Sequence, residues 1–250
     1  MTPVARIRLF AIALAVILVE VLCRTRVVDR LTMIPPSEML TGLVTLLARG
    51  TITLDIVSTL SNVAIALALA IVVGFVLGAL LFVLPRLRRL LDPLFATYYA
   101  IPIFVFYPLF IVLFGLNRYP QIAIGFLLAV VAMIINTLNG FDRVPRVLHK
   151  TARVYRMGRV STTLLVILPY AMLYVFTGLK LAVAYSFIGV IAAEFILSGE
   201  GMGYEINFAY NNFDNDTMYP LILLIVVIST FINMLLYAWE RRFRARQTDS

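Results

Sequence analysis

Long apolar runs, separated by short charged segments, dominate this sequence of 250 residues. A helix needs roughly 20 apolar residues to cross a bilayer. The runs predict six membrane helices, expected at about residues 9–22, 56–84, 94–116, 122–138, 164–193 and 221–239. The chain is therefore expected to be an all-α integral membrane protein, with one transmembrane domain over residues 1–250.

The third of these runs, residues 94–116, contains Pro102 and Pro108. Proline lacks the backbone N–H and so frees carbonyls inside a membrane helix, which a neighbour or a polar cavity must satisfy. Two interpretations stay open: a broken segment that lines a pathway, or a kink that serves packing. Gly74 and Gly78, spaced as Gly-x-x-x-Gly, permit close helix packing of the run 56–84.

The segments between the first helices predict smaller elements. Ser37 follows Pro35-Pro36 and is expected to cap an amphipathic helix that starts at Glu38, lies at the membrane interface and ends near Gly50. Residues 85–93, which are rich in arginine, are expected to form a short basic loop.

The composition agrees with a membrane protein. Hydrophobic residues make up 62% and charged residues 14%, and the mean hydropathy is +0.98, whereas soluble domains are about half apolar and about a quarter charged. Cys23 is the only cysteine and His149 the only histidine. An intramolecular disulfide, a cysteine-based metal cluster and a histidine-rich site are therefore excluded.

The positive charge follows the predicted topology. Residues 1–8, 85–93, 139–163 and the tail after residue 239 carry 2, 3, 6 and 4 Lys and Arg, which makes 15, and the opposite loops carry 5. This bias places both termini and the segment 139–163 in the cytoplasm. Topology thus accounts for the net charge of +8, and no nucleic-acid partner is expected.

The segment 139–163 and the residues after it match a spaced motif. The motif reads Glu-Ala-Ala, three residues, Gly, nine residues, Ile, one residue, Leu-Pro. Lys150-Thr151-Ala152 stands at the Glu-Ala-Ala place, Arg156 at the Gly place, Val166 at the Ile place, and Leu168-Pro169 matches. Lys150, Thr151 and Arg156 depart from the motif, and Gly158, two residues late, offers an alternative, shifted turn.

The flanking residues strengthen this match. Thr177-Gly178-Leu179-Lys180, Ala193-Glu194-Phe195 and Gly201-Met202-Gly203-Tyr204 fit the same pattern, as do Leu91-Asp92-Pro93, Ile101-Pro102, Pro108-Leu109, Phe114-Gly115 and Asn136-Thr137 upstream. With these residues the chain resembles the permease subunit of bacterial ABC importers, and within that family the nitrate/sulfonate/taurine group, over roughly residues 35–245.

The resemblance implies a type I ABC importer permease with six transmembrane helices and a cytoplasmic coupling helix, in the bacterial inner membrane. It implies three kinds of partner: a second permease, identical or different; cytoplasmic ATPase subunits; and an extracytoplasmic solute-binding protein. The sequence contains no Gly-x-x-x-x-Gly-Lys-Ser/Thr phosphate loop. We therefore expect a transport subunit that is not an enzyme and binds no cofactor, with ATP and Mg used by the partner ATPase.

The residues expected at the ATPase contact follow from the motif. They are Lys150, Thr151, Ala152, Tyr155, Arg156, Gly158, Leu168 and Pro169. Leu168-Pro169 suits a rigid joint to the next helix, because proline fixes φ at a helix start. The three departures predict a bulkier and more basic contact, and hence a partner with an acidic rim.

The residues expected along the pathway are fewer. Lys180 is a cation in mid-helix, which usually faces a bundle interior or cavity and would suit an anionic substrate; pairing with an acid or a carbonyl between subunits is the structural alternative. Glu194, 14 residues on or about 21 Å along an ideal helix, is expected near the outer mouth as a gate or packing residue. Asn136, Tyr185 and Ser186 are further lining candidates.

Other function classes lack their signatures. An ATPase-independent ion channel would need a filter motif or a ring of like charges, and a membrane enzyme would need a catalytic cluster within the helices. Exporter permeases usually show longer cytoplasmic helices and no loop of the coupling type. The substrate stays open: a nitrate-, sulfonate- or taurine-like anion is favoured, and bicarbonate, an aromatic acid or a vitamin precursor are alternatives.

Overall fold

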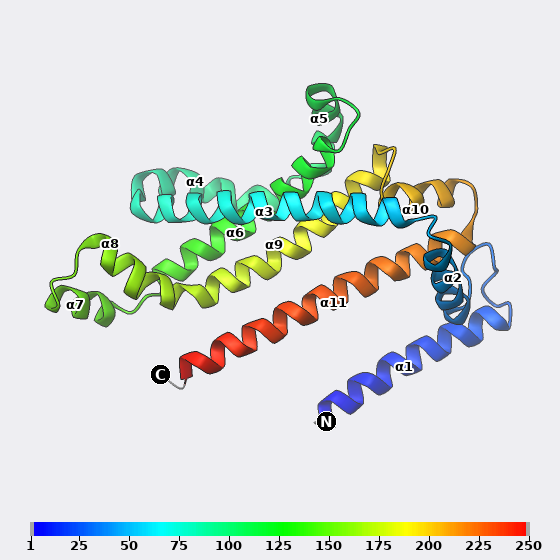
Figure 1. Ribbon diagram of the computed structural model, residues 1–250, viewed down its shortest axis with the longest axis horizontal. Helices are drawn as coiled ribbons and strands as arrows, with labels where there is room; N and C mark the ends of the chain where they lie inside the picture. The colour runs from blue at the N-terminus through cyan, green and yellow to red at the C-terminus, as the bar shows by residue number, and fades with distance from the viewer. Residues whose placement is uncertain (1–2, 249–250) are drawn as a thin grey trace. The chain divides into compact units, whose positions relative to one another are not determined.

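The computed structural model describes residues 3–248, and every regular element in that range is helical (Figure 1). The longer elements are α1 (Pro3–Arg24), α2 (Pro36–Arg49), α3 (Thr53–Val83), α4 (Pro85–Thr97), α5 (Tyr107–Phe114), α6 (Tyr119–Asp142), α7 (Arg146–Val154), α9 (Leu168–Leu197), α10 (Met202–Asn211) and α11 (Asn215–Thr248). Short turns are the 3-10 elements η1 (Tyr98–Ala100) and η2 (Ile103–Phe106), α8 (Arg159–Thr162) and the π-helical η3 (Thr163–Ile167). The predicted all-helical class is confirmed.

Four helices in the described range are long and apolar enough to cross a membrane. They span Thr53–Val83, Tyr119–Asp142, Thr163–Ile196 and Asn215–Arg241. A fifth candidate is a bent pair, Pro85–Ala100 with Ile103–Phe114, whose two parts meet at 92°. Helix α1, which carries Arg6, Arg8, Glu20 and Arg24 within 22 residues, is not among these candidates. The six predicted spans therefore stay a prediction.

The chain forms two compact units, whose boundaries fall inside α3, α9 and α11. The first comprises residues 1–58 and 194–230. Its core joins α2, the turn before α3, α10 and the start of α11 through Leu43, Ile52, Met202, Ile206 and Leu221.

The second unit comprises residues 59–193 and 231–250, and close contacts at glycines build its core. A Cβ added to Gly74 would lie 2.6 Å from the Cβ of Met133, and one added to Gly78 would lie 2.7 Å from the Cβ of Thr137. Helices α3 and α6 therefore pack at a distance that only glycine allows at these places. The close packing predicted for the Gly74–Gly78 pair is confirmed.

Helices α6 and α9 approach one another in the same way. A Cβ on Gly189 would lie 2.6 Å from the Cα of Gly125, and one on Gly178 would lie 2.9 Å from the Cβ of Asn136. Because the first of these contacts is with backbone, no side-chain rotation could relieve it. Helix α6 is therefore held by glycine contacts on two sides, against α3 and against α9.

The predicted basic loop at residues 85–93 was wrong, since these residues belong to α4. Pro85 stands in the first turn of the helix, where its fixed φ is favourable, and good helix formers follow. Arg88 then binds the Asp142 carboxylate with two hydrogen bonds of 2.9 and 2.6 Å, which tie α4 to the end of α6.

The predicted cap at Ser37 was also wrong. Helix α2 begins at Pro36 with Pro35 as its N-cap residue. The N–H and hydroxyl of Ser37 instead donate to the Glu20 carboxylate at 3.0 and 2.7 Å, and so link α2 to α1. The predicted end of α2 is confirmed, because Gly50 terminates it in the left-handed conformation, with φ +69°.

Candidate functional site

The predicted coupling segment contains a short exposed helix, α7, which begins after Pro145 and lies between α6 and α9 along the chain (Figure 1). Ala152, the residue that matches the motif, is buried, whereas Lys150 and Thr151, which depart from it, are exposed. Val154 and Tyr155 are 80% and 76% exposed. The helix thus presents large apolar side chains beside basic ones.

Arg156 occupies a backbone conformation that favours glycine. Its φ is +48°, and it follows the Tyr155 C-cap of α7. The Arg156 N–H donates to the Arg153 carbonyl at 3.0 Å, and the Met157 N–H donates to the Ala152 carbonyl at 2.9 Å. These are the two bonds of a Schellman cap, in which the left-handed residue is usually glycine.

This cap explains why the motif has glycine at the position that Arg156 occupies in this chain. The place needs a left-handed residue, and Arg156 adopts that conformation at a steric cost of about 1–2 kcal/mol. Gly158 does not have a left-handed φ, and it faces open space. The alternative that the turn is shifted to Gly158 is therefore wrong.

A π turn joins the coupling segment to α9. Pro169 cannot donate the hydrogen bond that a regular helix would make at its position. The Leu168 N–H reaches five residues back to the Thr163 carbonyl, so the chain continues from η3 into α9. Leu168, together with Leu148 of α7, packs against a cluster that contains Phe141 and Ile167. The joint is thus a wider helical turn packed against the end of α6.

Lys180 forms an ion pair within the chain. Its Nζ lies 2.6 Å from Oε2 of Glu240, and the two side chains are 31% and 5% exposed. Phe176 and Trp239, on the same two helices, meet edge to face with ring centroids 5.1 Å apart. The structural alternative placed this pairing between subunits, whereas the structure shows a pair within one chain.

Sequence reasoning missed Glu240. The sixth helix was expected to end at residue 239, whereas α11 continues to Thr248. Continuing the helical pattern through the arginine-rich tail would have put Glu240 on α11. Its partner Lys180 lies 60 residues earlier in the chain. The sequence alone does not show where α9 and α11 cross, so it could not identify this pair.

Glu194 lies under the first turn of α10 and is 1% exposed. Its Oε2 accepts the Gly203 N–H at 3.2 Å, while Asp55 accepts the Gly201 N–H at 2.9 Å. Carboxylates at these free N–H groups stabilise a helix start. A Cβ on Gly201, whose φ is +103°, would lie 2.5 Å from the Glu194 carboxyl carbon. Glu194 is thus a buried packing residue in this structure.

Two further acids border this turn, and sequence reasoning assigned neither of them a role there. Burial and the nearby Asp55 carboxylate raise the pKa of Glu205 above its ordinary value. Glu200 accepts a hydrogen bond of 3.4 Å from Ser58. Of the acids between residues 196 and 216, Glu200 and Glu205 therefore have structural contacts.

The remaining pathway candidates lie at helix contacts. Asn136 donates to the Ala132 carbonyl at 2.8 Å, within α6. Tyr185 stacks on Tyr99, with ring centroids 5.3 Å apart and an interplanar angle of 30°. Ser186 is fully buried, and its hydroxyl has no hydrogen-bond partner among the residues that the structure describes. Tyr99 was not predicted, although it stands close to the predicted break at Pro102.

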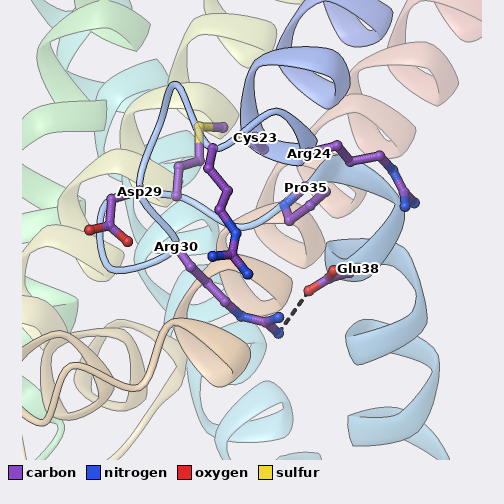
Figure 2. Close-up of a pocket in the computed structure, with 8 residues that line it drawn as sticks. Cys23, Arg24, Asp29, Arg30, Pro35 and Glu38 are labelled. Carbon is purple, nitrogen blue, oxygen red and sulfur yellow. Dashed lines mark ion pairs between the residues drawn. The ribbon is translucent and has the colours of Figure 1, made fainter.

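A polar pocket of about 600 Å³ lies at the corner between α1 and α2, lined by Cys23, Arg24, Arg26, Asp29, Arg30, Met33, Pro35 and Glu38. Figure 2 shows the ion pair between Arg30 and Glu38, whose atoms are 2.8 Å apart. Arg24 binds Glu20 at 2.6 Å. Acidic and basic side chains line or border the pocket and pair with one another. These ion pairs stabilise the connection between α1 and α2.

Comparisons with known proteins agree with this architecture. Residues 70–248 match the family "Binding-protein-dependent transport system inner membrane component". Among solved structures, the MetNI methionine ABC transporter in inward-facing conformations matches with a TM-score of 0.65 and 17% identity, covering 77% of this chain and 95% of that one. At this identity the likeness establishes the fold alone.

Three relatives illustrate the range of similar sequences. The nitrate import permease protein NrtB of Leptolyngbya laminosa is 31% identical over 72% of this chain and 65% of its own length. The bicarbonate transport system permease protein CmpB of Synechococcus elongatus is 33% identical, with coverages of 76% and 68%. A probable ABC transporter permease protein of Brucella melitensis is 30% identical, with coverages of 83% and 84%.

The match extends over most of the chain, and the chain spans about two thirds of the length of the first two relatives. The fold, the apolar helices and the motif residues agree with it. The chain therefore belongs to the family of binding-protein-dependent transport system inner membrane components, the permease subunits of ABC importers.

Proposed function

We propose that this chain is the membrane-spanning subunit of an ATP-driven importer and forms the translocation pathway for a small anion. The family match over residues 70–248 carries this proposal. The similarity to permeases named for nitrate and bicarbonate supports a small anion. A sulfonate, or taurine through its sulfonate group, is the other candidate. An extracytoplasmic binding protein would deliver the solute.

Helix α7 is proposed to dock onto a cytoplasmic ATPase, which would bind ATP and Mg. The exposed Val154 and Tyr155 would enter an apolar groove, and the exposed Lys150 and Arg156 would face an acidic rim. Ala152 is buried and so would support α7 from within the permease. Thr151 and Gly158 flank this surface, and both are exposed.

Movement of α7 would reach the membrane through the joint at Leu168-Pro169. Leu148 and Leu168 pack against the same cluster at the end of α6, and η3 continues into α9. A displacement of α7 would therefore shift α9, because a packed cluster transmits rigid-body movement. Helix α9 carries Tyr185 and Ser186, two of the proposed lining residues.

The proposed topology has six spans in the bacterial inner membrane. It adds α1 and the bent α4–α5 pair to the four long helices. Both termini and α7 lie in the cytoplasm by the excess of Lys and Arg there. A second permease subunit, identical or different, completes the pathway.

Lys180 enters this proposal as half of a pair. Glu240 neutralises its charge, so an anion would gain a net attraction at Lys180 only after the pair opens. Glu194 is proposed to hold α10 in place at the outer end of α9, through the Gly203 N–H. Asn136 would position α6 against α9 at Gly178.

Uptake into proteoliposomes tests the proposed function. The permease is co-expressed with the ATPase and binding protein of the same gene cluster, purified and reconstituted, and uptake of labelled nitrate, bicarbonate and taurine is measured with and without ATP. We expect the ATPase to co-purify and one of these three solutes to accumulate only with ATP. Equal uptake without ATP would instead identify a channel, and ATP-driven uptake of an uncharged vitamin precursor, with no uptake of nitrate, bicarbonate or taurine, would refute the anion class.

Arg156→Gly tests the strained cap and the acidic rim together. Glycine removes the cost of the left-handed φ, so α7 should become more stable by about 1 kcal/mol. The loss of the guanidinium should nevertheless weaken co-purification of the ATPase. Hydrogen exchange of the amides in residues 146–157 measures the first effect.

Arg153→Gly is the matched control, because Arg153 lies within α7 and glycine there should destabilise the helix by about 1 kcal/mol. Faster exchange in Arg156→Gly would contradict the account of the cap. Unchanged transport and co-purification in both Arg156→Gly and Lys150→Glu would rule out the acidic rim.

Lys180→Met tests whether the lysine serves structure or transport. It leaves the buried Glu240 without its cation, so we expect a loss of stability of roughly 1–3 kcal/mol. The double variant Lys180→Met/Glu240→Leu should recover most of the melting temperature and retain transport. A double variant that melts normally but transports nothing would show that Lys180 acts on the substrate.

A further inference from the structure

The break between α4 and α5 leaves irregular backbone inside an apolar segment. The two helical parts meet at 92°, and η1 and η2 occupy the corner. The bonds there are short-range: the Ile101 N–H donates to the Tyr98 carbonyl at 3.1 Å, and the Val105 N–H donates to the Pro102 carbonyl at 2.9 Å. Irregular backbone at membrane depth is tolerated only within protein or beside a polar cavity.

Two tyrosines connect this corner to α6. The Tyr98 hydroxyl donates to the Leu127 carbonyl at 2.9 Å, and the Tyr99 hydroxyl donates to the Leu128 carbonyl at 3.5 Å. The two rings meet edge to face, with centroids 5.6 Å apart. The corner is therefore attached to α6 by polar bonds, beside the glycine contact of α6 with α9.

The Tyr99 ring also bridges from the corner to α9. It stacks on Tyr185, as described above, while 44% of Tyr99 stays exposed. Exposed positions along α3, such as Val72 and Val76, are aliphatic, as lipid contact favours. A partly exposed tyrosine beside irregular backbone suits water better than lipid, and it favours the pathway-lining interpretation of the break over the packing kink.

We propose that the Tyr99–Tyr185 stack is an aromatic constriction in the translocation pathway, and this rests on the proposed function. The Tyr99 side belongs to the corner fixed to α6, whereas Tyr185 belongs to α9, the helix joined to α7. A shift of α9 would slide one ring off the other. The constriction would thereby respond to the ATPase without any direct contact with it.

Cysteine accessibility tests this constriction. Cys23 is the only cysteine of this chain, so Cys23→Ser makes this subunit cysteine-free. Labelling is followed on this subunit, separated from its partners, after reaction in membrane vesicles that hold the complete importer. Tyr99→Cys and Ala100→Cys, the second a small change at an exposed place in the corner, are treated with an anionic, membrane-impermeant methanethiosulfonate. Val76→Cys, on an exposed and aliphatic part of α3, is the lipid-facing control.

We expect positions 99 and 100 to react at least ten-fold faster than position 76. Adding Tyr185→Ala to Ala100→Cys should raise the rate further, because one half of the constriction is gone. Tyr170→Ala, an aromatic truncation on the same helix, should leave the rate unchanged. Rates at 99 and 100 equal to the rate at 76 would overturn the aqueous lining, and an unchanged rate with Tyr185→Ala would overturn the constriction.

These outcomes are separable from those of the proposed function. ATP-driven uptake with unreactive positions 99 and 100 would overturn the constriction and leave the importer intact. Reactive positions in a complex that shows no ATP-driven uptake would support water at the break and overturn the proposed function.

Discussion

The close approach of α3, α6 and α9 at glycines is the constraint on which the membrane part of this protein depends. Helices in a bilayer gain little from the hydrophobic effect when they associate, because lipid chains are as apolar as leucine. They associate through dispersion contacts, which weaken quickly with distance. At Gly125 and Gly189 two backbones meet so closely that a single methyl group would lie 2.6 Å from a main-chain carbon.

This packing fixes α6, to which both α9 and the α4–α5 corner are attached. Helix α7 is connected to α9 through the π turn at Thr163–Ile167. The hydroxyls of Tyr98 and Tyr99 attach the α4–α5 corner to α6 by hydrogen bonds. A movement that begins at α7 can therefore change the relation of α9 to the corner only if α6 stays in place. Its contacts with α3 at Gly74 and Gly78 would hold it there.

Local patterns predicted much of this architecture. Apolar runs predicted the helical class, the Pro35–Gly50 segment predicted a helix that ends at Gly50, and the spacing before Leu168-Pro169 identified the segment that holds α7. The motif also placed Arg156 where the backbone is left-handed. Each of these signals lies within one stretch of chain, where propensity and spacing act directly.

Pairs between distant elements were beyond sequence reasoning. Lys180 with Glu240, Glu194 and Asp55 with the start of α10, and Tyr99 with Tyr185 all depend on where helices cross. The prediction for residues 85–93 was wrong for another reason. Their positive charge predicted a cytoplasmic loop, whereas Pro85 and the helix formers after it form α4. Charge reports on which side of the membrane a segment lies, and it does not decide whether that segment is helical.

Thermal unfolding of Gly189→Ala against Gly199→Ala tests the central role of the glycine contacts most directly. Both variants add one methyl group, but Gly199 has open space around it and Gly189 meets backbone. We expect Gly189→Ala to lose roughly 1–3 kcal/mol of stability, the usual cost of overpacking, and Gly199→Ala to unfold like the parent protein. Equal unfolding temperatures for the two variants would contradict the account.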